Sequence, residues 1–159
     1  MGQEHVSDPV FKLYYSYCVE EVSEAFNRRL DRLLAMALFV LGASVMATVT
    51  SRMVIGLLVA FISGFQMTYK FGERAGKSKN QKTRYDELLN NRSAMTDKSL
   101  SSKLAAICKS DSTVPSWMKA VAHKKACIML GEDTDVVLTR WQRFLTTISG
   151  AGPITTQTS

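Results

Sequence analysis

The chain has 159 residues, a formal net charge of +6 and a mean hydropathy of −0.02. This length leaves room for one small domain at most beside any membrane spans. The three cysteines, Cys18, Cys108 and Cys127, show no framework spacing, which excludes a disulfide-stapled secreted scaffold and favours reduced cytosolic thiols.

Residues 1–32 predict an amphipathic N-terminal helix. Asp8 is a suitable N-cap, and Pro9 suits the first helical position. Apolar side chains then recur at helical spacing, at Phe11, Tyr14, Tyr15, Cys18, Val22, Ala25 and Phe26. The remaining surface is acidic, mostly through Glu20, Glu21 and Glu24. Helices that lie on membranes usually carry Lys and Arg there, so we expect this helix to pack against the chain's own helices.

Two apolar runs follow almost back to back, Leu33–Val49 and Met53–Tyr69, and neither contains a charged residue. A helix of this length rises about 26 Å against a hydrocarbon core of about 30 Å, and flanking charged side chains can snorkel to cover the difference. The alternative is a buried hairpin in a soluble core, but a soluble helix normally keeps a polar stripe. The sequence therefore predicts a two-span transmembrane hairpin over residues 33–69.

The distribution of charge predicts the orientation of this hairpin. The net charge is −2 before it, +1 in its turn at Arg52 and +7 after it. Basic residues are retained on the cytoplasmic side, so we expect both termini in the cytoplasm and the short turn on the outer side. The basic run after the second span can also contact anionic lipid or an anionic ligand, through Lys70, Arg74, Lys77, Lys79, Lys82 and Arg84. We expect no sequence-specific DNA binding, because Phe71 is the single aromatic residue in this run before Tyr85.

The rest of the chain predicts a cytoplasmic helical region over residues 70–149 and a flexible tail over 150–159. Gly72 and Gly76 are candidate hinges in its first helix. Helical spacing and stop signals predict four helices: Lys70–Leu89, ending near Asn90–Asn91; one from Thr96 or Asp97 to a break at 111–115; Ser116–Leu130, ended by Gly131; and about Thr134–Ile148. No strand alternation is present, so the predicted fold class is all-α.

The sequence offers little support for catalysis. His123 and Cys127 are four residues apart, which is half of a metal site, but no second pair completes it and structural roles are favoured. Gly72 and Gly76 precede Lys77, yet the spacing and the preceding strand of a phosphate-binding loop are missing. We expect no enzymatic activity, no metal and no cofactor.

The second span carries a ridge of small residues, Gly56, Ala60 and Gly64, which allows close helix contact in lipid. The predicted pore or helix-packing face comprises Arg52, Gly56, Ala60, Ser63, Gly64 and Gln66. An unpaired amide inside a span costs several kcal/mol. Gln66 therefore lines a pore, joins the two spans or reaches interfacial water. Two helices alone enclose no aqueous path, so a pore requires a homo-oligomer.

Several features follow one another between about Phe26 and Leu130: Arg29–Arg32 before the first span, Phe71 and Arg74 after the second, the Tyr85-x-x-Leu88 pattern within Lys82–Leu89, and the helices Ser99–Lys109 and Ala120–Leu130. This architecture resembles the SLATT domains, two-span effector domains associated with bacterial nucleotide-signalling and other anti-phage systems. The resemblance implies an effector of the bacterial inner membrane that oligomerises into a pore and depolarises the infected cell. It also implies a partner sensor or nucleotide-synthesising enzyme, or its nucleotide or nucleic-acid product, as the trigger.

Two other functions fit the same pattern. A phage holin or superinfection-exclusion protein shares the hairpin and the basic tail, although about ninety residues follow the second span here. A membrane anchor or adaptor would form no pore and would dock partners through Val137–Ile148. The anchor predicts that Gln66→Leu or Gly56→Leu spares activity, whereas a pore predicts loss or altered conductance. An unregulated holin predicts lysis on expression alone.

Overall fold

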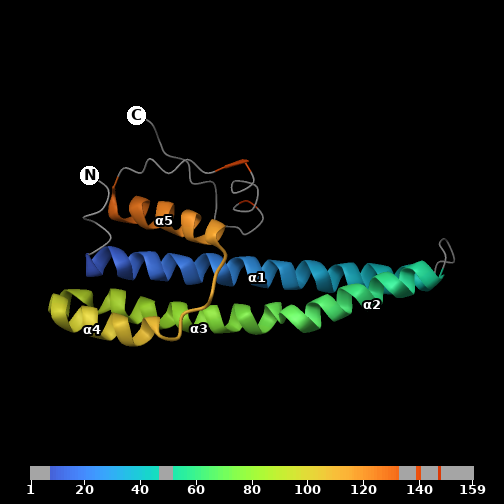
Figure 1. Cartoon of the computed structure of the whole chain (residues 1–159), viewed down its shortest axis with the longest axis horizontal. Helices are drawn as coiled ribbons and strands as arrows, with labels where there is room; N and C mark the ends of the chain where they lie inside the picture. Colours follow the sequence, from blue (N-terminus) through green and yellow to red (C-terminus); the bar gives the residue numbers. More distant parts are fainter. Residues whose placement is uncertain (1–7, 47–51, 133–138, 141–146, 148–159) are drawn as a thin grey trace.

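In the computed structural model the chain forms an elongated, all-helical molecule (Figure 1). The structure describes residues 8–46, 52–132, 139, 140 and 147, and contains no strand among them. The all-α fold class is therefore confirmed. The described elements are, in chain order, helices α1 (Pro9–Met46), α2 (Arg52–Tyr69) and α3 (Phe71–Asn90), the 3-10 turn η2 (Arg92–Ala94), and helices α4 (Asp97–Cys108) and α5 (Ser116–Leu130).

Helix α1 is the axis of the molecule. It begins at the predicted cap, where the Asp8 carboxylate accepts a hydrogen bond from the Val10 N–H at 2.9 Å. Its 38 residues correspond to a length of about 57 Å. It runs without interruption through the predicted N-terminal helix and into the predicted first span, because no Gly or Pro occurs between residues 10 and 41. The predicted boundary at residue 32 is therefore a change of side-chain character within one helix.

The other helices pack along α1. Helices α2 and α3 return along one side of it, α4 lies beside α3, and α5 covers the opposite side (Figure 1). The apolar face of α1 packs against α5, with Cys18 and Val22 in one core cluster with Val121. This confirms that the N-terminal segment packs on the chain's own helices. Its acidic side is also covered, because Glu20 and Glu24 are buried as well.

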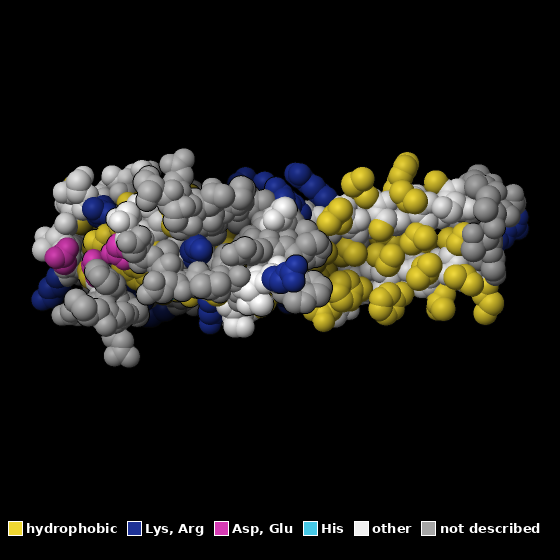
Figure 2. Space-filling model, turned by 90° about the horizontal axis from the view of Figure 1, so that it is seen from above, with side chains coloured by type: hydrophobic (Ala, Val, Ile, Leu, Met, Phe, Trp, Pro, Cys, Tyr) yellow, Lys and Arg dark blue, Asp and Glu magenta, His cyan; other side chains and the backbone are white. Residues whose placement is uncertain are grey.

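The far end of the molecule is apolar. It comprises residues 33–46 of α1 and helix α2, here called the apolar half, and its surface in Figure 2 is almost entirely hydrophobic. Its exposed large side chains are Leu33, Met36, Phe39, Val40, Met53, Val54, Leu57, Leu58, Phe61, Phe65, Met67 and Tyr69. The remainder of the described chain, residues 8–32 and 70–132, is called the polar half.

Among the described residues, one helical stretch, Arg52–Asn90, contains a segment long and apolar enough to cross a membrane. Only 11% of that segment is buried, whereas the core helix of a soluble protein would be mostly buried. The predicted first span, Leu33–Val49, continues into residues 47–51, which lie outside the described part. The two-span topology therefore stays a prediction.

A kink at Lys70 separates α2 from α3. Lys70 adopts the left-handed conformation, with φ 47° and ψ 50°, whereas Gly72 and Gly76 lie within helix α3 and show no positive φ. The predicted helix thus breaks at its first residue, before the two glycines that were the candidate hinges. The backbone bonds continue across it, from the Lys70 N–H to the Gln66 carbonyl at 2.9 Å and from the Arg74 N–H to the Lys70 carbonyl at 3.0 Å.

The remaining boundaries agree with the sequence. Helix α3 ends at Asn90, α4 follows Thr96, and α5 has the predicted bounds, with Gly131 in the left-handed conformation at φ 71°. The last predicted helix, Thr134–Ile148, falls mostly outside the described residues, and so does the predicted tail, 150–159.

The kink yields a prediction about stability. A side chain in the left-handed region costs about 1–2 kcal/mol, so we expect Lys70→Gly to raise the free energy of unfolding by up to about 1 kcal/mol after the greater entropy of unfolded Gly is subtracted. Lys70→Ala is the matched control, because Ala loses the same charge and keeps the strain. Denaturant unfolding of the full chain in an uncharged detergent measures both. Equal effects of Gly and Ala would show that the backbone conformation is not the cause.

Candidate functional site

The small-residue ridge of α2 faces away from α1. Helix α2 turns its more buried positions, Ile55, Val59, Ile62 and Gln66, toward α1. Gly56, Ala60 and Gly64 are exposed, and no other described residue lies within 4 Å of a Cβ built on either glycine. Arg52 and Ser63 are exposed as well. Of the predicted pore or packing face, only Gln66 is thus used within the described chain.

Gln66 joins the two antiparallel helices at the base of the apolar half. Its side-chain Nε2 donates to Asp31 Oδ1 at 3.2 Å. A Cβ at Gly72 would lie 3.4 Å from Asp31 Oδ2, so the missing side chain lets the start of α3 pass close to the same carboxylate. The contact links α2 to α1 just before the predicted first span, so it is close to the alternative in which Gln66 joins the two apolar helices. Asp31 was not among the partners predicted for Gln66.

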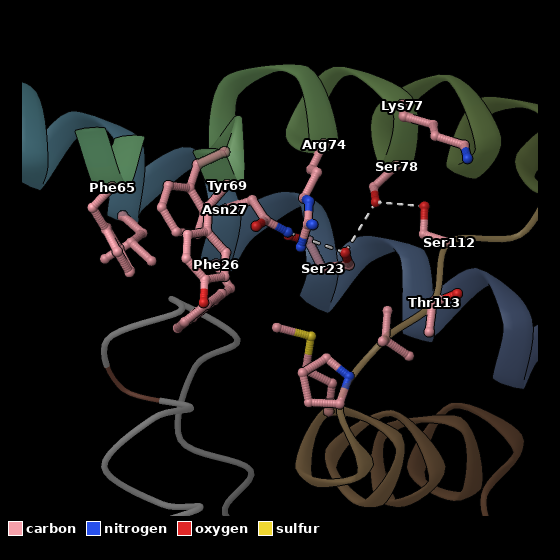
Figure 3. A pocket seen from close by; sticks show the side chains of 15 residues that line it. Ser23, Phe26, Asn27, Phe65, Tyr69, Arg74, Lys77, Ser78, Ser112 and Thr113 are labelled. Atoms are coloured by element: carbon pink, nitrogen blue, oxygen red, sulfur yellow. Dashed lines mark hydrogen bonds between the residues drawn. The ribbon is translucent and has the colours of Figure 1, made fainter. Parts of the chain in front are cut away.

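A cavity of about 590 Å³ lies beside this contact, where the apolar half meets the polar half (Figure 3). Its lining comes from α1, the end of α2, the start of α3, the loop between α4 and α5, and the first turn of α5. Arg74 points from α3 into the space between the helices, toward Asn27 and Ser23 (Figure 3). The described lining contains two cations, Arg74 and Lys77, but no carboxylate, His or Cys.

Aromatic rings form the wall of this cavity nearest the apolar half. Tyr69 stacks on Phe71 with ring centroids 5.6 Å apart, and Phe65 lies 4.4 Å from Tyr69. The Arg74 guanidinium carbon is 5.9 Å from the centre of the Tyr69 ring, within the range of a cation–π contact. This contact places the Arg74 guanidinium beside the end of α2.

Hydroxyl groups form the opposite wall. Ser78 of α3 donates to Ser23 of α1 at 3.0 Å and lies 3.5 Å from the hydroxyl of Ser112 in the loop between α4 and α5. The Asn27 amide also donates to the Ser23 carbonyl at 2.8 Å. Three separate segments of the chain therefore meet in one hydrogen-bonded group. The cavity offers groups that bind and orient a ligand, without a general acid or base among its described residues.

The basic residues predicted to contact an anion fall into three groups. Arg74, Lys77, Lys79 and Arg84 are all exposed on α3, and Arg74 and Lys77 also line the cavity. The other two pair within the chain: exposed Lys70 with Glu73 at 3.2 Å, and Lys82 with buried Glu24 at 2.6 Å. Burial alone would lower the pKa of Lys82, but the hydrogen bond and charge of Glu24 raise it overall. Lys82 therefore holds α3 against α1.

Glu20 is a buried acid that the sequence analysis placed off the packed face. It is 1% exposed, and its Oε1 accepts a hydrogen bond from the Ser112 N–H at 3.0 Å. Its Oε2 has no hydrogen-bond partner among the described residues. Burial raises the pKa of Glu20, and the hydrogen bond from the Ser112 N–H offsets part of that rise.

The same loop is tied to α3. Gln81 donates to the Ile107 carbonyl at 2.7 Å and to Asp111 Oδ1 at 2.9 Å, and the Tyr85 hydroxyl donates to the same carboxylate. This network and Glu20 together fix the loop that forms the hydroxyl wall of the cavity.

The predicted half of a metal site is packed among aromatic rings. The His123 ring lies edge-on to Phe11 at 5.4 Å and to Tyr15 at 6.3 Å, and its Nδ1 is 3.7 Å from the sulfur of Cys127. No group of three metal-ligating side chains is found within the described part of the chain.

Burial raises the pKa of Cys18 to about 12, so this thiol is unreactive at neutral pH.

No known protein family, curated protein or solved structure matches this chain. The resemblance to the SLATT domains therefore rests on the sequence pattern alone.

The buried acid makes stability depend on pH. Burial raises the pKa of Glu20 in the folded state above its ordinary value of 4.5. The protonated carboxyl therefore stabilises the fold fully below pH 4.5, and this stabilisation is lost as the pH rises through the folded-state pKa. We expect Glu20→Gln to be more stable than the wild type at pH 8 by about 1 kcal/mol or more. The difference should shrink as the pH falls toward 4.5.

Thermal unfolding across this pH range measures the effect. Glu87→Gln is the control, because it removes one negative charge from an exposed position on α3. A gain from Glu20→Gln that does not change with pH would contradict the role of the buried carboxylate.

The Gln66–Asp31 hydrogen bond gives a second prediction. Side-chain hydrogen bonds between helices in membrane proteins contribute about 0.6 kcal/mol on average and up to about 1.7 kcal/mol. We expect Gln66→Leu to lower stability by about 1 kcal/mol, and the effect to disappear in an Asp31→Ala background. A double-mutant cycle in mixed micelles measures this coupling. Thr68→Val is the control, since the Thr68 hydroxyl bonds to the Gly64 carbonyl of its own helix; coupling of Thr68 to Asp31 of equal size would contradict the assignment.

Proposed function

We propose that the chain is a two-span protein of the bacterial inner membrane with both termini in the cytoplasm. The apolar half supports this, since its described residues expose large hydrophobic side chains such as Phe39, Leu57 and Phe61. A monomeric soluble protein rarely exposes an apolar surface of that extent. Tyr69 at the end of α2 suits the boundary between lipid and water, and the basic residues after it suit the cytoplasmic side.

The chain acts as a homo-oligomer in this proposal. Helices associate in lipid through close packing, and small residues allow it. Gly56, Ala60 and Gly64 form such a surface, and no described part of the chain covers it. A second copy can pack there, and several copies around an axis can surround a pore.

The proposed activity is depolarisation of the inner membrane by this pore, most specifically as an anti-phage effector that acts in abortive infection. The resemblance to the SLATT domains supports the defence role, and the uncovered ridge is the observation that carries pore formation. A partner sensor, a nucleotide-synthesising enzyme or its nucleotide or nucleic-acid product would supply the trigger. The anchor or adaptor is the second candidate, and the bond between Gln66 and Asp31 favours it, because that amide is already used inside the chain.

Membrane potential in bacteria expressing the full chain tests the proposal. A voltage-sensitive dye reports it with and without the neighbouring genes and with phage challenge. We expect rapid depolarisation on triggering, and at least about tenfold weaker depolarisation in Gly56→Leu, because a bulky side chain separates the packed helices. Leu57→Phe adds bulk at an adjacent exposed position of α2 and is the matched control, with activity near that of the wild type.

Other outcomes separate the candidates. An unchanged potential under every trigger, with the protein present in the membrane fraction, would favour the anchor or adaptor. Depolarisation that is insensitive to Gly56→Leu would contradict the ridge as the contact between copies. Lysis on expression alone, without a trigger, would favour a holin.

A further inference from the structure

The cavity at the junction of the two halves has the chemistry of an anion site. Its described lining carries two positive charges and no negative one. Neither Arg74 nor Lys77 forms an ion pair with a described carboxylate, whereas Lys82 and Lys125 on the surrounding helices do. Two cations that line a cavity without a paired acid are open to an anionic ligand.

The geometry of Arg74 selects among anions. A guanidinium donates two parallel hydrogen bonds, a fork that matches the oxygens of phosphate. Figure 3 shows Arg74 pointing into the cavity toward the serine wall, while Lys77 runs along α3 at its edge. The Ser112 hydroxyl points toward Ser78 of α3 (Figure 3) and adds a hydroxyl group to the lining. We propose that this cavity binds a phosphate group, with Arg74 as its main ligand and the Ser112 hydroxyl as a further donor.

The rest of the cavity fits the remainder of a phosphate ester. Its volume of about 590 Å³ lies within the range of about 300–1,000 Å³ typical of ligand pockets. The rings of Phe26 and Tyr69 supply an apolar side, against which a glycerol backbone, an acyl chain or a nucleobase can lie. The ligand is thus an organic phosphate with an apolar or planar part, more closely matched to the site than inorganic phosphate.

Two sources carry this chemistry. Tyr69 and Phe65 belong to the last turns of α2, so the cavity borders the apolar half, and an anionic phospholipid headgroup reaches it if the proposed membrane topology holds. A soluble nucleotide or sugar phosphate reaches it from the cytoplasm. Arg74 recognises the same group in both cases, so the phosphate site does not depend on pore formation.

Binding to the full chain in an uncharged detergent tests the proposal. The probes are phosphatidylglycerol in mixed micelles, and glycerol 3-phosphate and adenosine monophosphate in solution. Diacylglycerol and sodium chloride at matched ionic strength are the controls without phosphate. A ligand that binds the folded state raises the melting temperature. We expect a saturable rise with at least one phosphate probe, and at least about tenfold weaker apparent affinity in Arg74→Gln.

Arg84→Gln is the matched control, because it removes the same charge from an exposed position of the same helix outside the cavity. We expect it to keep the wild-type affinity within about twofold, and Ser112→Ala to weaken binding by less than Arg74→Gln. Circular dichroism checks that the variants keep their helices.

The pattern of binding identifies the source. Binding of phosphatidylglycerol alone assigns a lipid headgroup, and binding of a soluble probe assigns a free phosphate ester; both support the site. No saturable rise with any phosphate probe overturns it. Equal weakening by Arg74→Gln and Arg84→Gln also overturns it, because the basic surface as a whole would then account for the affinity. Depolarisation plays no part in this measurement, so failure of the pore and failure of the phosphate site are distinguishable.

Discussion

The continuous backbone of α1 is the constraint on which the rest of the structure depends. This unbroken helix has 38 residues and contains two chemically different segments. The acidic segment before residue 32 needs polar or charged partners, and the uncharged segment after it needs an apolar environment. In the polar half it is covered on two sides, by α5 on its apolar face and by α3 on its acidic face. The ion pairs from Glu21 to Lys125 and from Glu24 to Lys82, both 2.6 Å, lie on these two sides. The acids of α1 therefore serve as internal partners for basic helices.

Helices α2 and α3, which run back along α1, are separated by a kink, and this kink lies beside the cavity. Helix α2 meets α3 at the left-handed Lys70, and the residues on either side of that kink, Tyr69 and Arg74, both line the cavity. The Gln66–Asp31 bond and the close approach of Gly72 to Asp31 fix the same region to α1. A ligand held by Arg74 would contact groups on both sides of the kink. Its binding energy would therefore depend on the angle between α2 and α3, and it would favour one angle over others.

Local signals predicted most helix boundaries, and non-local contacts explain the exceptions. Pro115 and Gly131 bound α5 at the residues where the structure begins and ends it, because capping preferences act within one turn. Gly72 was predicted to be a hinge, but its lack of a side chain instead lets α3 pass close to Asp31. This contact joins two helices, so a pattern within one helix cannot predict it. The burial of Glu20 and the Gln66–Asp31 pair were missed for the same reason. In a pair of antiparallel helices, residues at equal distances from the connected ends lie side by side. Residues 31 and 66 nearly satisfy that relation, because Asp31 lies about as far before the end of α1 at Met46 as Gln66 lies after the start of α2 at Arg52.

The arrangement of α2 bears on why the small residues face outward. If α1 and α2 packed only against each other, the most stable arrangement would turn Gly56, Ala60 and Gly64 toward α1. The two backbones could then approach closely and form more dispersion contacts. Instead the β-branched Ile55, Val59 and Ile62 lie on the α1 side, and branched side chains fill that space without close backbone contact. In a bilayer the hydrophobic effect does not drive helices together, so their association depends on close packing. Small residues such as glycine allow that close packing with a second helix. No described part of the chain covers this small-residue surface. In the proposed membrane topology, such a surface is expected of a span that packs against a second copy, and it is not required of a span that only anchors.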